Sequence, residues 1–387
     1  MRYDKREIGD LVTLRQGFAI NKKTKHHISE EPTALHLLRI GDMKDGTFSI
    51  YVKDTIPDKF IAKENDIIYT RTGQVGLVFR NQHGVVHNNC FTVTTNDDDV
   101  LLQEFLYYVL QEKAFYEEAN SRATGAAQPD LPHGAFNSIK IFFPPVEKQK
   151  RITDILNTYD QLIKNNQKQI KLLEEAAQRL YKEWFVDLRF PGYEDCKIVD
   201  GVPVEWEKKK LDEIADVIMG QSPKSEFYNK EHKGLPFHQG VGSYGARFVQ
   251  DDTYSTSFTK VAEANSILFS VRAPVGRLNI TKNKIVIGRG IAAINSKSGF
   301  QSYLFYALKE RFFKDDILGN GAIFASISKN ELLNQVFVIP DEKIMSAYEK
   351  IAAALDKKIE VVDMQLQQLV EARDRLLPKL MNGEIEV

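Results

Sequence analysis

Three short segments of the sequence have residue types and spacing that could carry catalytic or ligand chemistry. The segment Phe143-Pro-Pro-Val146 holds a double proline like that of DNA adenine methyltransferases, but it lacks their polar residue before the prolines and their aromatic residue after them. The segment Gly73-Gln-Val-Gly76 is too short for a glycine-rich nucleotide loop. His83 and His87 have the spacing of metal ligands, yet no cluster of carboxylates or cysteines accompanies them. The sequence therefore predicts no catalytic, cofactor or metal site in this chain.

A second group of residues has the hydrogen-bonding chemistry that reads DNA. Arg and Lys pair with guanine, Asn and Gln pair with adenine, and turns let such side chains approach a groove. In the first 145 residues these types gather in a basic run at 15–27 and in turns near Arg39 and Arg71. The basic run could equally be a solvated loop without a role in binding. Asn88 and Asn89 form a further candidate pair, and they could equally cap a turn. The predicted DNA contacts are Arg15, Gln16, Lys22, Lys23, Lys25, Arg39, Arg71, Thr72, Gln74, Asn88 and Asn89.

The chain nearly repeats itself at an offset of about 200 residues. Apolar spacing survives where identity does not, and one matched pair reads in both copies as a β-branched and aromatic strand followed by a turn. Pro144 and Pro340 then close the two globular parts. The matched segments are 7–17 with 210–220, 65–76 with 265–276, and 124–131 with 320–327.

The second copy carries different polar residues at the matching places. His238 and its neighbour fall at the place of the Arg39 turn, Arg272 falls near Arg71, and Arg289 falls at the place of Asn89. Different side chains at matching places predict that the two copies read different base sequences. The predicted DNA contacts of the second copy are Gln221, Ser222, Lys224, His238, Gln239, Arg272 and Arg289.

A long helical pattern without interior Gly or Pro follows each globular part, and its apolar residues fit a heptad. Each pattern covers roughly 40 residues, hence about 60 Å of helix. A lone stripe of this kind favours dimerisation, but two equal stripes in one chain favour an intramolecular antiparallel pair, with Asn166 against Val362 as a polar break that sets register. The predicted pairing residues are Ile152, Ile155, Tyr159, Leu162, Asn166, Leu173, Leu180, Ile351, Leu355, Val362, Leu369 and Leu376.

The composition is that of a folded chain without a large charge excess. The 387 residues hold 52 Lys and Arg against 53 Asp and Glu, with a formal net charge of −1. Proteins that hold DNA by bulk electrostatics usually carry a clear basic excess, so any DNA binding must use local clusters or charge borrowed from a partner. The two cysteines, Cys90 and Cys196, are too few for a disulfide framework. No apolar stretch suggests a membrane span or a signal peptide, so we expect a cytoplasmic protein.

Four short sequence segments support a resemblance to the specificity subunits of type I restriction-modification systems. The resemblance extends along essentially the whole chain. Residues 180–192 look like the end of that family's central helix, and residues 201–206 like its entry into the second domain. Residues 376–387 resemble the C-terminal phrase, and residues 144–149 the entry into the first helix. The second copy of that entry, residues 340–343, departs from the double proline.

The resemblance implies an α+β fold in which two target recognition domains, in a pseudo-two-fold repeat, are joined by two long antiparallel coiled-coil helices. Each recognition domain would read one half of a bipartite, asymmetric site in double-stranded DNA, and the helices would set the spacer. Two modification subunits would dock on the helices and supply S-adenosylmethionine and methyl transfer. Restriction subunits would add cleavage that needs ATP and Mg²⁺. This chain itself would be non-catalytic and free of cofactors.

The predicted order of domains follows from the repeat. The boundaries are recognition domain 1 at 1–145, a central helix at 146–190, a linker at 191–206, recognition domain 2 at 207–340, and a C-terminal helix and tail at 341–387. Two other functions stay open at this point. One is a nuclease or methyltransferase with an unrecognised site, and the other is a coiled-coil adaptor without sequence preference.

Overall fold

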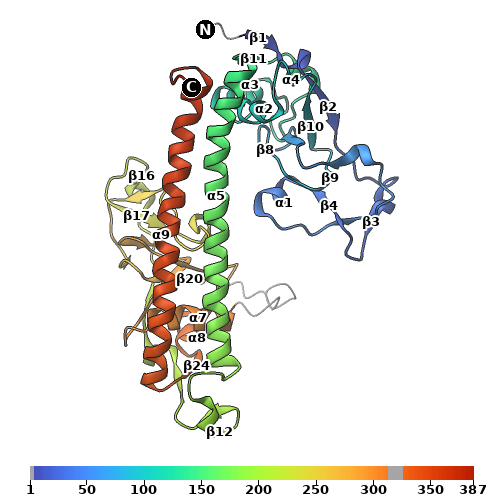
Figure 1. The fold of residues 1–387 in the computed structure, drawn as a ribbon. Coiled ribbons are helices and arrows are strands. Elements are labelled where there is room, and N and C mark those ends of the chain that lie inside the picture. Colours follow the sequence, from blue (N-terminus) through green and yellow to red (C-terminus); the bar gives the residue numbers. More distant parts are fainter. Residues whose placement is uncertain (1–3, 313–325) are drawn as a thin grey trace. The chain divides into compact units, whose positions relative to one another are not determined.

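The computed structural model describes residues 4–312 and 326–387, and the chain divides into two compact units. Unit 1 comprises residues 1–165 and 366–387, and unit 2 comprises residues 166–365. Each unit holds one globular part built of short strands and helices, together with part of each of two long helices (Figure 1). The N-terminal unit is therefore completed by the C-terminal end of the chain.

The globular part of unit 1 contains three small sheets. Listed in spatial order within each sheet, the strands are β1 (Asp4–Glu7) and β11 (Lys140–Phe143); β2 (Val12–Gln16), β10 (Cys90–Thr95), β7 (Ile67–Thr70) and β8 (Val78–Phe79); and β3 (Ile28–Ser29), β5 (Tyr51–Val52), β4 (Leu35–Leu38), β9 (Gly84–Val86) and β6 (Ile61–Ala62). Its short helices are α1 (Ile40–Asp45), α2 (Gln103–Val109), α3 (Lys113–Arg122) and α4 (His133–Asn137).

The globular part of unit 2 contains the same three kinds of sheet. In spatial order, the strands are β14 (Glu207–Lys210) and β24 (Val336–Ile339); β15 (Ala215–Met219), β23 (Ile291–Ser296), β20 (Ile267–Ser270) and β21 (Leu278–Ile280); and β16 (Tyr228–Asn229), β18 (Tyr254–Ser255), β17 (Leu235–His238), β22 (Ile285–Ile287) and β19 (Val261–Ala262). Its short helices are α6 (Leu211–Ile214), α7 (Gln301–Phe312) and α8 (Lys329–Leu333), and a hairpin of β12 (Ile198–Val199) and β13 (Val202–Pro203) precedes them.

The order of strands confirms the pseudo-two-fold repeat. Both units have a four-stranded sheet and a five-stranded sheet with corresponding strand orders. The side chains at the start of α2 and α7 repeat as well. Gln103 accepts the backbone N–H of Thr95 at 2.8 Å, and Gln301 accepts that of Ser296 at 2.8 Å. The α+β fold class predicted from the sequence is therefore confirmed.

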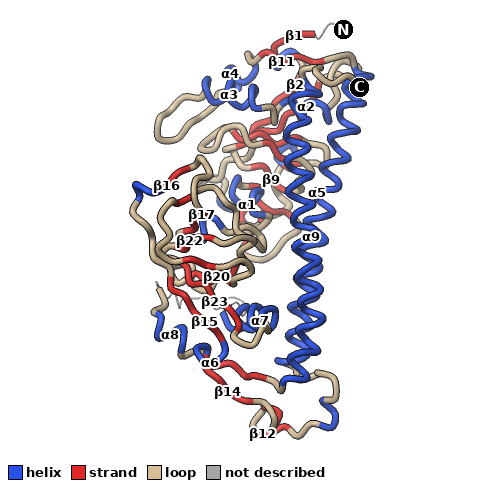
Figure 2. Tube along the Cα trace, turned by 90° about the vertical axis from the view of Figure 1, so that its left-hand side faces the viewer, coloured by secondary structure: helices blue, strands red, loops and turns tan. Residues whose placement is uncertain are grey.

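The two long helices, α5 (Val146–Tyr181) and α9 (Glu342–Met381), lie side by side in each unit (Figures 1 and 2). In unit 1, Leu156 near the start of α5 shares a core with Leu380 near the end of α9. In unit 2, Ala177 near the end of α5 shares a core with Met345 near the start of α9. The pairing is antiparallel, as predicted. In the described residues, no helix combines the length and the apolar character that crossing a membrane requires.

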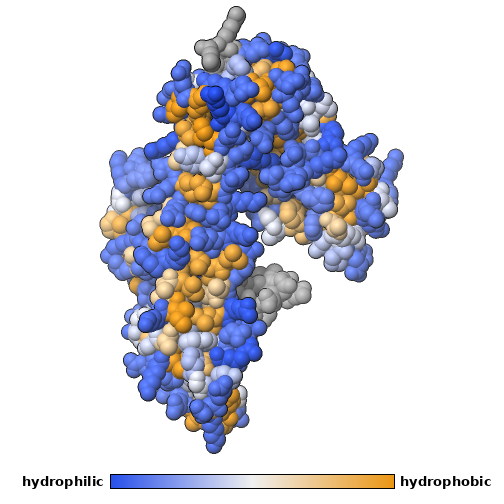
Figure 3. Space-filling view, viewed as in Figure 1, coloured by the Kyte–Doolittle hydropathy of each residue, from blue (hydrophilic) through white to orange (hydrophobic). Residues whose placement is uncertain are grey.

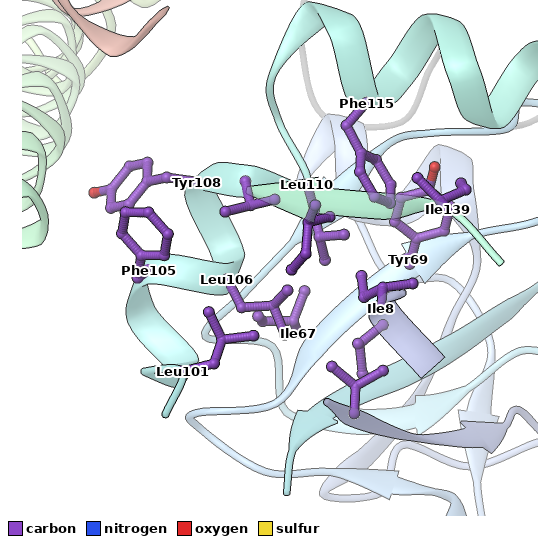
Figure 4. Packing of buried hydrophobic residues seen from close by; sticks show 14 of the residues in the cluster. Ile8, Ile67, Tyr69, Leu101, Phe105, Leu106, Tyr108, Leu110, Phe115 and Ile139 are labelled. Carbon is purple, nitrogen blue, oxygen red and sulfur yellow. The ribbon is translucent and has the colours of Figure 1, made fainter. Parts of the chain in front are cut away.

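The core of unit 1 shows why its strands form where they do. Every residue of β7 is buried, as its run of β-branched and aromatic side chains predicts. Tyr69 of β7 packs against Phe91, Phe115 and Phe136, with ring centres 5.0–6.1 Å apart. Aliphatic and aromatic residues from α2 and the flanking strands fill the rest of this cluster (Figure 4). The central strand thus holds the four-stranded sheet, and the turns at its ends, against the short helices.

The helix seam of α5 buries part of the predicted stripe together with the adjacent stripe that carries Ile163 and Ile170. In α5, buried residues recur every seven positions at Leu156, Ile163, Ile170 and Ala177. Of the predicted pairing residues, Ile152 and Asn166 of α5 and Val362 of α9 are buried. Two of the remaining predicted pairing residues are exposed, and the other seven are half-buried. The half-buried residues are Ile155, Tyr159, Leu173, Leu180, Leu355, Leu369 and Leu376.

The prediction was wrong for Leu162 and Ile351, which are 44% and 43% exposed. Helix α5 carries apolar residues on adjacent stripes, so two patterns with alternating spacings of three and four fit its sequence equally well. The globular parts also pack against these helices and select the stripe that is buried. Spacing alone does not contain that information.

The register leads to a prediction with a built-in control. We expect Ile163→Asp to lower the free energy of unfolding by about 3–5 kcal/mol, because Ile163 is 7% exposed and the new carboxylate would lack a partner. We expect the neighbouring Leu162→Asp to change it by no more than about 0.5 kcal/mol, since Leu162 faces solvent. Chemical denaturation followed by circular dichroism measures both. Equal losses in the two variants would contradict this register.

Candidate nucleic-acid interface

A turn at residues 288–290 lies among the predicted DNA contacts of unit 2. Its middle residue, Arg289, donates its backbone N–H to the Ser222 hydroxyl at 3.3 Å. The last residue of the turn, Gly290, donates its N–H to the Gln239 carbonyl at 3.1 Å, and its carbonyl accepts the N–H of Val271 at 3.0 Å. Three segments that are far apart in the sequence therefore meet at one turn, and each of them carries predicted contact residues.

Four polar side chains around this turn have unused hydrogen-bonding capacity. Arg272 and Arg289 are exposed, as are Gln221 and Gln239. Within the described ranges, none of these four side chains forms a hydrogen bond or an ion pair with the rest of the chain. Lys224 is also exposed, with its ammonium 3.9 Å from Glu226. The guanidinium and amide groups are therefore free to contact base edges or phosphates.

His238 does not belong to this exposed set. It is 1% exposed, its Nδ1 lies 2.8 Å from the Ser243 hydroxyl, and its Nε2 lies 2.9 Å from the Asp251 carboxylate. Both ring nitrogens are therefore occupied within the protein, and the predicted DNA contact was wrong at this position. The residue ends β17, where successive side chains alternate between the two faces of the sheet. The sequence match between His238 and the Arg39 turn does not tell on which face of the sheet the His238 side chain lies.

The corresponding turn of unit 1, at residues 87–90, gathers predicted contacts in the same way. The Asn88 carbonyl accepts a hydrogen bond from the Gln16 side chain at 2.6 Å. The Asn89 carbonyl accepts the backbone N–H of Arg71 at 2.8 Å. The side-chain amides of Asn88 and Asn89 have no hydrogen-bond partner in the described part of the chain. In unit 1 the turn therefore presents amides where unit 2 presents a guanidinium group.

Arg71 is held by a carboxylate that the sequence did not single out. Its Nε and Nη2 donate to the two oxygens of Asp130 at 3.1 and 2.6 Å, and its Nη1 donates to Gln16 at 3.0 Å. The Thr72 hydroxyl donates to Asp130 at 2.5 Å. Hydrogen bonding from Arg71 lowers the pKa of the Asp130 carboxyl group, so this carboxylate is ionised at neutral pH. The position of Asp130 near the end of a repeated segment was the only signal, and it did not indicate this pair.

The two units differ at this carboxylate. Thr72 pairs with Asp130 in an isolated β-bridge of unit 1, and Arg272 pairs with Ser326 in the corresponding bridge of unit 2. Arg272 therefore takes the place of Thr72, and Val271, whose N–H donates to the Gly290 carbonyl as that of Arg71 donates to Asn89, takes the place of Arg71. The same backbone arrangement therefore carries the carboxylate-bound Arg71 in unit 1 and, one residue further along, the exposed Arg272 in unit 2.

Two further arginines of unit 1 are engaged with buried carboxylates. Arg15 donates from Nη2 to Asp66 at 2.7 Å, and Arg39 donates to both oxygens of Asp42 at 2.7 and 2.8 Å. Asp42 and Asp66 are each 8% exposed. Buried carboxylates of this kind require a partner, so these arginines have a structural task in the protein.

The three predicted lysines of unit 1 lie exposed in a turn at residues 21–25. The Thr24 hydroxyl fixes that turn, because it donates to the Ala19 carbonyl at 2.7 Å and accepts the Asn21 N–H at 2.8 Å. In the ranges that the structure describes, these ammonium groups form no ion pair. Gln74 is also exposed, in the turn that follows β7. The lysines that this turn presents to solvent are Lys22, Lys23 and Lys25.

Comparison with known proteins identifies the class to which this arrangement belongs. Residues 2–175 and 203–372 match the family described as the type I restriction modification DNA specificity domain. The two matched segments cover one globular part each, and together they make up most of the chain.

Whole relatives match as well. The putative type I restriction enzyme MjaX specificity subunit of Methanocaldococcus jannaschii is 30% identical over all of this chain and 94% of its own length. The HindI specificity subunit of Haemophilus influenzae is 23% identical over 84% of this chain and 87% of its own length. The crystal structure of the S subunit from M. genitalium superposes with a TM-score of 0.60 at 19% identity, over 98% of this chain and 96% of that one. The chain belongs to the specificity subunits of type I restriction-modification systems.

Proposed function

We propose that this chain, without catalytic activity of its own, binds a bipartite, asymmetric DNA site in which each unit reads one half. The observation that carries the proposal is the pair of matching turns at residues 87–90 and 288–290. They occupy the same place in the two units but present different side chains. One fold used twice with different polar groups provides for two different half-sites.

The side chains at the two turns favour different bases. Asn88 and Asn89 offer amides, which pair with adenine through its N6 and N7. Arg272 and Arg289 offer guanidinium groups, which pair with guanine through its O6 and N7. We therefore propose a guanine in the half-site of unit 2 and an adenine in that of unit 1. Arg15 and Arg39, which hold buried carboxylates, would contribute through position and charge rather than through direct base contacts.

The long helices offer a surface for partner subunits. Leu162, Leu172, Ile351 and Met364 are 42–53% exposed, and Figure 3 shows hydrophobic atoms gathered over α5 and α9. We propose that two modification subunits cover this surface and supply S-adenosylmethionine, and that restriction subunits add steps that need ATP and Mg²⁺. The formal net charge of −1 supports such an assembly, because partners would then provide part of the grip on DNA phosphates.

Single-molecule sequencing of methylated adenines, in host DNA with and without this gene, tests the proposal. We expect one split, asymmetric motif to disappear when the gene is removed. Replacing residues 1–145 with those of another specificity subunit should then change only one half of that motif. A change in both halves, or in neither, would be incompatible with one unit reading each half-site. Methylation or cleavage by the purified chain alone would favour an enzymatic function instead.

Arg289 provides a prediction at the level of one base pair. We expect Arg289→Ala to weaken binding of the cognate site by about 1–3 kcal/mol and to relax discrimination at one position of the second half-site, because one bidentate contact to a base is lost. Replacing Lys22, Lys23 and Lys25 with Ala should instead weaken binding to all DNA sequences alike and reduce the salt dependence of the affinity. Competition binding of the assembled complex to single-base variants at several salt concentrations measures both. Uniform weakening by Arg289→Ala would assign Arg289 to phosphate.

A further inference from the structure

A half-buried polar contact in unit 1 ties the globular part to a long helix. Arg80 follows β8, Tyr108 lies in α2, and Asp160 lies in α5. Arg80 donates from Nη2 to Asp160 at 2.8 Å and to the Tyr108 hydroxyl at 3.2 Å, and that hydroxyl in turn donates to Asp160 at 2.8 Å. Figure 4 shows Tyr108 at the edge of the apolar cluster, with its hydroxyl pointing away from the other labelled residues. The three groups form a closed triangle of hydrogen bonds.

The second long helix joins the same carboxylate. Arg373 of α9 donates from Nη1 to the other oxygen of Asp160 at 3.1 Å. The Arg80 guanidinium also lies over the Tyr107 ring, 4.1 Å from the ring centre. Burial raises the pKa of Tyr108, so its hydroxyl stays protonated and able to donate. One carboxylate therefore connects the globular part of unit 1 with both α5 and α9.

Unit 2 contains the same contact, more deeply buried. The Arg247 side chain is 2% exposed and donates from Nη2 to Asp356 of α9 at 2.5 Å. The Tyr306 hydroxyl of α7 donates to the same oxygen at 2.8 Å. The guanidinium lies 3.7 Å from the centre of the Phe305 ring, and its Nη1 lies 3.9 Å from Glu174 of α5. Here too, one cluster contacts both long helices.

The two contacts repeat in geometry, although the arginines do not repeat in sequence. Asp160 lies as many residues after Pro144 as Asp356 lies after Pro340, and each tyrosine lies in the helix after the four-stranded sheet. Arg80 follows β8, whereas Arg247 lies in the loop before β18. We call each set an Arg–Asp–Tyr bridge, and the two bridges comprise Arg80, Asp160 and Tyr108 in unit 1 and Arg247, Asp356 and Tyr306 in unit 2.

Ion pairs that are largely removed from solvent, as these two are, contribute little net stability, because the desolvation of the charges offsets their attraction. They do impose geometry, since a buried charge tolerates few alternative arrangements. Apolar side chains alone would already hold each globular part on its helices, as the shared clusters show. The bridges add a directional constraint to that packing.

We propose that the two Arg–Asp–Tyr bridges fix the angle of each globular part on its helices, and that they thereby restrict the enzyme to one spacer length between half-sites. The inference rests on the proposed function and deepens it. The six residues act as positioning residues that touch no DNA. Loosening a bridge lets the globular part tilt, so half-sites that are one base pair closer together or further apart become accessible, while the bases that are read stay the same.

The test uses the chain assembled with its modification subunits. Methylation rates are measured on DNA carrying the two half-sites at the native spacing, and at spacings one base pair shorter and longer. We expect the double variant Tyr108→Phe/Tyr306→Phe, which removes only two hydroxyl groups, to reduce discrimination between spacings on the order of tenfold. Asp160→Asn should act in the same direction. The half-site sequences should stay unchanged in both variants.

Glu118→Gln is the matched control. It breaks an Arg–carboxylate pair of 2.6 Å with Arg122, but that pair lies within α3 and contacts neither long helix. It should leave spacer discrimination intact. Unchanged discrimination in the tyrosine double variant would overturn the inference, and so would loss of assembly in both bridge variants, which would leave the bridges only a structural role. A wild-type complex that methylates no split site at any spacing would overturn the proposed function itself.

Discussion

Removal of residues 376–387 is expected to unfold the globular part of unit 1 while unit 2 stays folded. Leu380 and Met381 are 0% and 5% exposed in the core that also holds Leu156. Burial of each such side chain contributes about 1.5–3 kcal/mol. Their loss would therefore remove about 3–6 kcal/mol, a large part of the 5–15 kcal/mol that typically holds a domain together. Unit 2 contains none of the deleted residues.

Hydrogen exchange resolved by segment measures this effect. Amides of β7 and β10 should lose protection in the truncated chain, and those of β20 and β23 should keep it. Removal of residues 384–387 alone is the control, because it deletes only the half-buried Ile385 and Val387 from the same cluster. Loss of protection in both units at once would show that they unfold together, and retained protection in unit 1 would show that the tail contributes little.

Replacement of Gly220 with alanine is expected to abolish reading of the half-site assigned to unit 2. A Cβ atom at this position would lie 2.2 Å from the Gly288 carbonyl oxygen and 2.8 Å from that of Ile291. Both obstacles are backbone atoms, so the turn that carries Arg289 must move. Overpacking of this kind typically costs about 1–3 kcal/mol. Gly17 is the equivalent in unit 1, where a Cβ atom would meet the His87 oxygen at 2.2 Å.

Mapping of the methylated motif measures the effect of both variants. Gly220→Ala should remove sequence information from one half of the motif, and Gly17→Ala from the other half. Gly240→Ala is the control in unit 2, since open space surrounds its Cβ position and its φ of −172° is extended backbone that any residue adopts. An unchanged motif in Gly220→Ala would mean that the turn at residues 288–290 does not read DNA.

Local patterns account for what could be predicted from the sequence. The run from Asn65 predicts a strand followed by a turn, and β7 is a buried strand at that place. Its counterpart from Asn265 predicts β20 in the same way. Such patterns depend on neighbouring residues only, because the period of a strand or a helix is a property of the local backbone. The repeat then extended each local prediction to the second half of the chain.

Contacts between distant segments account for what could not be predicted. Asp130 meets Arg71 across 59 residues, and Asp356 meets Arg247 across 109 residues. Nothing in the spacing of these residues indicates that they are partners. Their pairing depends on where the sheets and helices place them. Because of this pairing, some arginines are bound to carboxylates of the protein while others stay exposed.

The repeat, the two long helices and the resemblance to a family could all be recognised in the sequence, since they depend on periodicity and on segments that recur along the chain. The tertiary structure alone decided which stripe of α5 is buried, why His238 is withdrawn from the surface, and why Arg71 is bound while Arg289 is exposed. Burial and pairing depend on three-dimensional neighbours, because a side chain is paired or exposed according to the carboxylates and apolar surfaces that folding places beside it.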